Sequence, residues 1–175
     1  MFRLLYDPVS EIRHAKKQGY AKLLLYLVAV SLFATAGVLF LAARYFPSAL
    51  TLNLLVSGIV GLLFGLIAAH IVVAFFFSFA LHILDGKGGY YDGLTALVYA
   101  MVAPAIMLFF GGALTFIPFG PILFLFLLVY GVVLGTATLF RAAKEFFELD
   151  YAGVLSAVLI TFVPLIFLCT TLFNL

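Results

Sequence analysis

The spacing of the charged residues constrains this chain more than any other feature, because it leaves four long stretches without Asp, Glu, Lys or Arg. A helix needs about 20 mostly apolar residues to cross the roughly 30 Å hydrocarbon core of a membrane. Each uncharged stretch is at least that long, and they run from Lys22 to Arg44, from Arg44 to Asp85, from Asp92 to Arg141, and from Asp150 to the end. The chain is therefore predicted to span a membrane.

Composition agrees with this prediction and excludes other classes. Hydrophobic residues make up 67% of the 175 residues and charged residues 9%, whereas about 25% charged is usual in soluble domains. A domain of this size in water leaves much of its surface exposed and could not hide so many apolar side chains. Aqueous enzymes, disulfide scaffolds and nucleic-acid binders are excluded, and a net charge of +2 gives no reason to expect a nucleic-acid partner.

Prolines and glycines divide the uncharged stretches into five spans. A turn at Pro47 opens the second stretch, and Pro118, Gly120 and Pro121 break the third, because they cannot continue one straight helix. We predict an all-α membrane protein with a cytoplasmic N-terminal segment, residues 1–22, and a single five-helix transmembrane domain, residues 23–175. The spans are expected at about residues 23–43, 54–81, 94–114, 122–140 and 153–173.

The N-terminal segment is too polar for a signal peptide, and the apolar stretch after it has full spanning length. Asp7 and Pro8 are typical of a helix start. Val9, Ile12 and Ala15 then share one helical face. A short amphipathic helix on the membrane surface and a solvated basic tail are both consistent with this pattern.

The distribution of charge predicts the orientation. With the N-terminus in the cytoplasm, eight of the nine Lys and Arg residues and all seven acidic residues lie inside, and Arg44 lies outside. This bias follows the positive-inside rule. We therefore expect a multi-pass protein of the cell membrane with a cytoplasmic N-terminus and an external C-terminus, whose cytoplasmic face is its working surface.

The predicted spans contain no charged residue, which argues against proton pumps, voltage sensors and ion-coupled carriers. His70, near the middle of the second span, is the candidate functional residue of this interior. It is either a neutral imidazole bonded to a neighbouring helix or a proton-responsive or metal-touching group. No spacing of nucleophile and base or of metal ligands is recognisable, so we predict no enzyme, no catalytic residue, no metal and no cofactor.

Glycines four residues apart indicate that two of the spans pack closely against other helices. Gly61 and Gly65 form one GxxxG pattern, which Gly58 extends along the same face, and Gly131 and Gly135 form the other. Small residues let membrane helices approach closely. Packing within the chain and a homodimer seam are both compatible with each pattern.

The segment from Asp85 to Gly93 is the most distinctive polar stretch. It resembles a phosphate loop only superficially, because no Ser or Thr follows its lysine and no strand precedes it. A turn containing Gly88 and Gly89 is the simpler interpretation, with Asp92 in the N-terminal cap of the third span.

A weak internal repeat relates residues 91–106 to residues 151–166 and matches Pro104 with Pro164. It suggests a duplication of spans two and three as spans four and five. Proline-interrupted spans in corresponding positions also occur in transporters, although a proline in a span is more often a packing kink that neighbouring helices tolerate.

The chain resembles the Yip1 domain family, in its short prokaryotic form. The resemblance is carried by Gly88 and Gly89 at the end of span two and by Thr95, Tyr99 and Pro104 in span three, with Pro164 in the last span. It implies five spans and a cytoplasmic N-terminus. The long N-terminal region and DLYGP-like motif of the eukaryotic branch are missing, so no GTPase partner is carried over.

These observations favour a non-enzymatic membrane protein that organises or shapes the bilayer, or scaffolds partners through its cytoplasmic face. Its partners would be the lipid bilayer and a second copy or another membrane protein. One alternative is a small-molecule or lipid transporter with a site near the prolines of spans three and five, using hydroxyls at Tyr99, Tyr130, Thr136, Thr138 and Thr161. Another is an accessory subunit of a membrane complex.

Overall fold

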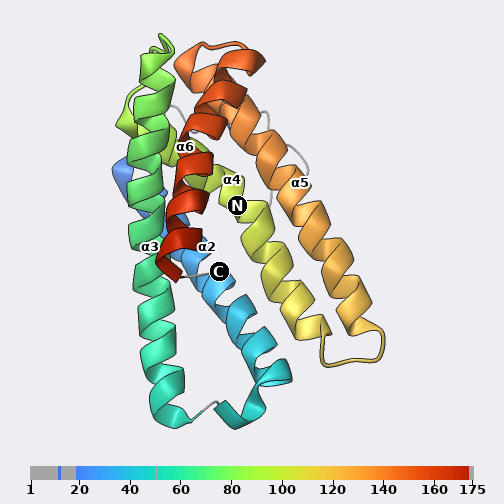
Figure 1. Ribbon diagram of the computed structural model, residues 1–175. Coiled ribbons are helices and arrows are strands. Elements are labelled where there is room, and N and C mark those ends of the chain that lie inside the picture. Colours follow the sequence, from blue (N-terminus) through green and yellow to red (C-terminus); the bar gives the residue numbers. More distant parts are fainter. Residues whose placement is uncertain (1–11, 13–18, 50, 174–175) are drawn as a thin grey trace.

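A computed structural model describes residue 12, residues 19–49 and residues 51–173. In this part of the chain five long helices and one short 3-10 turn follow one another, without a strand (Figure 1). They are α2 (Tyr20–Tyr45), η2 (Pro47–Ala49), α3 (Leu52–Ile83), α4 (Tyr90–Leu114), α5 (Gly120–Phe147) and α6 (Tyr151–Phe173). Each long helix has the length and apolarity to cross a membrane. The predicted all-α fold with five spans is confirmed.

Each of the five helices extends beyond its predicted span, and α5 extends furthest. It continues past the predicted end at residue 140 to Phe147. The added residues alternate in a helical pattern, with Arg141 and Lys144 exposed and Ala142, Ala143, Phe146 and Phe147 buried. Packing, rather than the end of the apolar stretch, therefore sets the length of this helix.

The predicted break between the third and fourth spans lies between Leu114 and Gly120. Phe119 adopts a left-handed backbone with φ of 63° before α5 begins. A Cβ atom on Gly120 would collide with the carbonyl oxygen of Leu114. Pro121 then occupies the first turn of α5, where a missing N–H leaves no helical hydrogen bond unmade.

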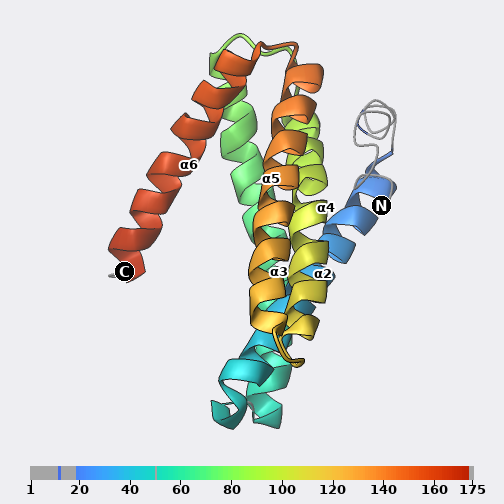
Figure 2. The ribbon, with the colours of Figure 1, turned by 90° about the vertical axis from the view of Figure 1, so that its right-hand side faces the viewer.

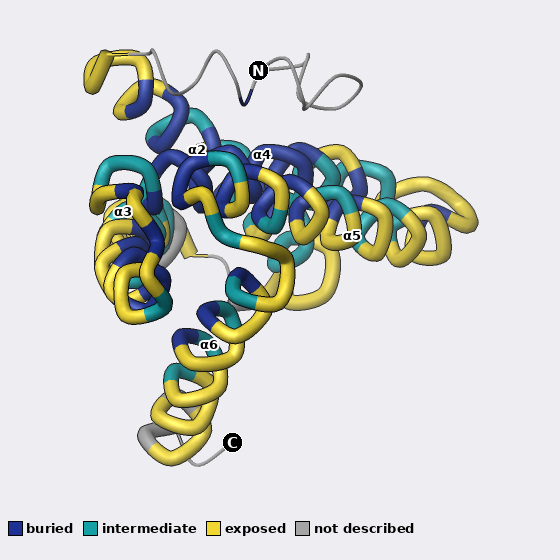
Figure 3. Tube along the Cα trace, turned by 90° about the horizontal axis from the view of Figure 1, so that it is seen from above, coloured by how far each residue is buried: buried dark blue, intermediate teal, exposed yellow. Residues whose placement is uncertain are grey.

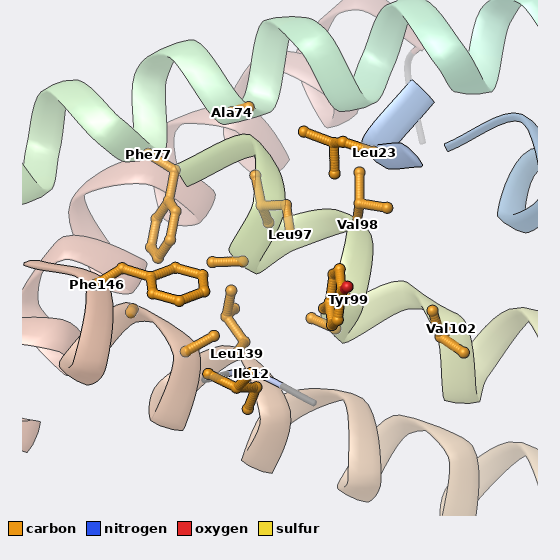
Figure 4. Packing of buried hydrophobic residues seen from close by; sticks show 14 of the residues in the cluster. Ile12, Leu23, Ala74, Phe77, Leu97, Val98, Tyr99, Val102, Leu139 and Phe146 are labelled. Atoms are coloured by element: carbon orange, nitrogen blue, oxygen red, sulfur yellow. The ribbon is translucent and has the colours of Figure 1, made fainter. Parts of the chain in front are cut away.

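Helix α4 is the central element, because it packs against α2, α3 and α5 (Figure 3). Its buried residues Leu97, Val98, Tyr99 and Val102 meet side chains from the surrounding helices (Figure 4). Helix α6 diverges from the other four toward its C-terminal end (Figure 2). Accordingly, its buried side chains lie in its first half, and from residue 163 onward its described side chains are mostly exposed.

Charge is separated along the molecule as predicted. Of the ten charged residues described, nine lie in the half that holds the α3–α4 and α5–α6 connections, and Arg44 lies at the opposite end (Figure 1). We call the half that holds these nine residues the charged end; they are Lys22, Asp85, Lys87, Asp92, Arg141, Lys144, Glu145, Glu148 and Asp150. From the N-terminal segment only Ile12 and residues 19–22 are described, and Ile12 is fully buried with the core. The predicted surface helix otherwise falls outside the described residues.

Candidate functional site

A groove of about 400 Å³ lies between α3, α4, α5 and α6. Eleven of its thirteen lining residues have no polar side-chain group apart from the sulfur of Met101, and the exceptions are His70 and Thr136. The lining comprises Leu66, Ala69, His70 and Val73 of α3, Leu97, Ala100, Met101 and Pro104 of α4, Val132, Gly135, Thr136 and Leu139 of α5, and Phe162 of α6. The sequence candidates His70, Pro104 and Gly135 thus come together here.

His70 is held in the groove wall by its own helix. Its Nδ1 lies 2.7 Å from the carbonyl oxygen of Leu66, one turn earlier. A carbonyl oxygen can only accept, so Nδ1 carries the proton and donates, and Nε2 of the neutral ring is an acceptor. The residue is 9% exposed, and Nε2 is buried without a partner among the described residues. The expected bond to a neighbouring helix is therefore replaced by a bond within α3.

Pro104 and Gly135 form the contact between α4 and α5 in the groove. Pro104 has no N–H to donate to the carbonyl of Ala100, four residues earlier. A Cβ atom on Gly135 would lie 2.6 Å from that carbonyl oxygen and 2.8 Å from Cγ of Pro104. Glycine alone lets α5 approach the freed carbonyl so closely, and its Cα–H groups are suited to weak hydrogen bonds there.

Gly131 extends this contact by one helical turn, since its Cβ would lie 2.9 Å from Cβ of Met107. The GxxxG pattern of α5 is thus used within the chain. The identical pattern of α3 is not: a Cβ atom on Gly58, Gly61 or Gly65 would meet no described atom within 4 Å beyond its own helix. Among the described residues, intrachain packing is therefore the wrong interpretation for these three glycines, because no described helix lies against the face that they form.

The glycine-rich connection between α3 and α4 packs closely against the C-terminal end of α5. Gly86 and Gly88 lie against the Phe147 ring, and a Cβ on Gly88 would stand 2.8 Å from it. The N–H of Lys87 donates to the Phe147 carbonyl at 3.0 Å. Its Nζ reaches a Glu148 carboxylate oxygen at 2.8 Å, and this hydrogen bond raises the pKa of Lys87. The α3–α4 connection is thereby attached to the end of α5.

Two carboxylates at the charged end accept backbone N–H groups at the N-termini of α4 and α6. Asp92 accepts the N–H of Gly89 at 2.9 Å, and Asp150 accepts the N–H of Gly153 at 2.7 Å. Both are typical N-terminal capping bonds, so Asp92 has the structural role expected from the sequence. Nδ1 of His82 donates to the Gly86 carbonyl at 3.1 Å. Within the described residues no three His, Cys, Asp or Glu side chains gather into a possible metal site.

Three further sequence candidates also lie away from the groove. Tyr99 is 2% exposed and packs its ring against Tyr26 of α2, with centroids 5.4 Å apart. Pro164 is exposed in the diverging half of α6. Gly89 is exposed in the α3–α4 connection. The matched prolines of the sequence repeat therefore have different surroundings, because Pro104 lies against Gly135 of α5 and Pro164 is exposed.

Sequence reasoning missed two close helix contacts. A Cβ on Gly37 of α2 would lie 2.8 Å from backbone and side-chain atoms of Leu108, and a Cβ on Gly112 would lie 2.9 Å from the Gly37 carbonyl oxygen. A Cβ on Gly93 would collide with the Ser78 hydroxyl. The glycines themselves are the signal, but their partners are far away in sequence and no spacing rule links them.

Comparison with models of protein families, with curated proteins and with solved structures finds no match to this chain.

Proposed function

We propose that this protein is a non-enzymatic, multi-pass membrane protein that organises its membrane or holds partners through its charged end, which we place in the cytoplasm. The observation that carries the proposal is the construction of that end. The backbone of Lys87 and the ring of Phe147 hold the α3–α4 connection on α5, while the charged groups of Lys87 and Glu148 stay exposed. A fixed backbone with exposed charges suits binding.

The interior supports the same proposal. The described charged residues lie in the charged end or at Arg44, and the groove lining holds one imidazole and one hydroxyl. A charged group or a nucleophile with a base would be expected of a pump or an enzyme.

The orientation is tested with single cysteines in a Cys169→Ser background. Lys87 and Ser48 are exposed at opposite ends, so Lys87→Cys and Ser48→Cys make a matched pair. In intact cells a membrane-impermeant maleimide should label the Ser48→Cys protein alone, and after lysis it should label both. Labelling of Lys87→Cys in intact cells would refute the proposed orientation.

Partner binding is tested by affinity capture from native membranes. Changing Lys87 and Glu148 together to Gln removes an exposed ion pair that contributes little to stability, and Arg44→Gln is the control at the other end. Loss of a captured partner with the first variant but not with the control supports the proposal that partners bind to the charged end. Equal capture by both variants, or solute flux through reconstituted protein, contradicts it.

A second candidate function, a subunit of a membrane complex or a homo-oligomer, is favoured by one observation. The small-residue face of α3 at Gly58, Gly61 and Gly65 has no neighbour in the described part of the chain, and such faces allow close helix approach in membranes. The transporter alternative receives less support from the structure. Of its five hydroxyl residues only Thr136 lines the groove, and this hydroxyl donates to the Val132 carbonyl at 2.9 Å.

A further inference from the structure

The wall of the groove contains an unsatisfied acceptor. Nε2 of His70 is buried without a partner among the described residues, while Nδ1 is committed to Leu66. The other polar side chain of the lining, Thr136, already donates to Val132. Hydrocarbon offers no water to satisfy such an atom. Only a molecule that brings its own donor into the groove can bond to it.

The position of the groove indicates that this molecule comes from the bilayer. Thr136 precedes Arg141 by five residues, which is about 7.5 Å of helix rise, so the groove lies in the apolar zone below the charged end. Phe162 is the residue that α6 contributes to the lining, and α6 diverges from the groove beyond this point (Figure 2). Entry is therefore from the side, out of the lipid.

The size of the groove favours a small molecule over a helix. About 400 Å³ falls in the range of roughly 300–1,000 Å³ that is usual for small-ligand sites, whereas a helix with its side chains is about 10 Å across. Nε2 of His70 is fully covered by protein atoms, so lining side chains must move to admit a donor. Met101, with its flexible unbranched chain, is suited to this movement.

We propose that the groove binds a long-chain alcohol, whose hydrocarbon body fills the apolar lining and whose hydroxyl donates to Nε2 of His70. An alcohol fits because it is uncharged, as an apolar lining requires, and because it has an O–H donor. A methyl ether of the same chain lacks the donor and a charged amphiphile would stay at the membrane surface. The proposal stands on the groove and does not depend on the charged end.

The test uses a long-chain alcohol with a photoreactive diazirine on its chain and the corresponding methyl ether, each added to the full-length protein in liposomes. The wild-type protein should be labelled about five to ten times more by the alcohol than by the ether, as a hydrogen bond to a buried acceptor implies. His70→Leu should remove this preference, and His70→Gln, which keeps an acceptor, should retain part of it.

Two exposed alanines of α3 provide a matched control for the groove itself. Ala69 lines the groove and Ala68 does not. Ala69→Phe should reduce labelling by both probes, and Ala68→Phe should leave it unchanged, with equal melting temperatures in detergent confirming that both variants fold. Equal labelling of the wild type by alcohol and ether, or equal labelling of the two phenylalanine variants, would overturn the proposal.

Discussion

At the scale of single residues, the same amino acid has opposite consequences at Gly61 and Gly135. A Cβ on Gly135 would lie 2.6 Å from the Ala100 carbonyl oxygen, whereas one on Gly61 would meet none of the described atoms within 4 Å. Substitution at a tight helix contact forces the backbones apart, and substitution at an open site only changes helix propensity. Substitutions at the two positions therefore distinguish the role of glycine in close helix packing from its low helix propensity.

Gly135→Ala should destabilise the protein by about 1–3 kcal/mol, the usual cost of overpacking a tight contact. Gly61→Ala should be neutral or stabilise it by up to about 1 kcal/mol, because Ala is the better helix former. Thermal unfolding of the two variants in the same detergent, followed by circular dichroism, measures both effects. A Gly135→Ala protein as stable as the wild type would show that α5 does not pack against α4 in this way.

A second contact can be tested by rescue. Gly93→Ala places a methyl group against the Ser78 hydroxyl, whose oxygen has no hydrogen-bond partner among the described residues. We expect Gly93→Ala to be destabilising, Ser78→Ala to be nearly neutral, and the double variant to recover part of the loss, with a coupling of about 1 kcal/mol or more. Additive effects in the melting temperatures would argue against direct contact between α3 and α4 at these positions.

At the scale of elements, contacts with particular residues determine the path of a connection as much as they determine the packing of a helix. The α3–α4 connection owes its path to Phe147, because Gly86 and Gly88 lie on its ring and Lys87 donates to its carbonyl. The sequence predicts a turn there from the glycines alone. It does not predict which residue the turn covers, since Phe147 is about 60 positions later in the chain.

Phe147→Ala should remove the surface on which this connection rests. Phe147 is fully buried, and truncation of such a residue typically costs about 3–5 kcal/mol. We expect the α3–α4 connection to become a preferred cleavage site, so that trypsin cuts after Lys87 much faster than in the wild type. The exposed Phe126 of α5 is a matched control, because Phe126→Ala should leave the cleavage rate unchanged.

At the scale of the whole molecule, the sequence predicts the spans but not their neighbours. Charge spacing and prolines locate five helices because the membrane imposes their length, and the ends differ most at α5, where Phe146 and Phe147 stay in the core. Helical periodicity identifies the small-residue faces of α3 and α5 equally well. Whether such a face has a partner depends on the packing of the whole bundle, and for that reason Gly135 lies against α4 while no described helix lies against Gly61.

The unpaired face of α3 yields the last prediction, on assembly. If two copies associate through it, Gly61→Leu with Gly65→Leu should separate them, because larger side chains keep helix backbones apart. The same variant should keep its fold, since both positions face open space. A matched variant with larger side chains at the exposed Val129 and Val133 of α5, Val129→Leu with Val133→Leu, should still associate.

Association is measured by energy transfer between labelled copies in liposomes at several ratios of protein to lipid. Loss of transfer in the glycine variant alone assigns the seam to α3. Undiminished transfer in that variant would show that the copies meet elsewhere, and no transfer in the wild type would show that this face meets lipid or another protein. In each case the glycine variant should unfold at the temperature of the wild type or above it, because a Cβ atom at either position meets no described atom within 4 Å and Leu is a better helix former than Gly.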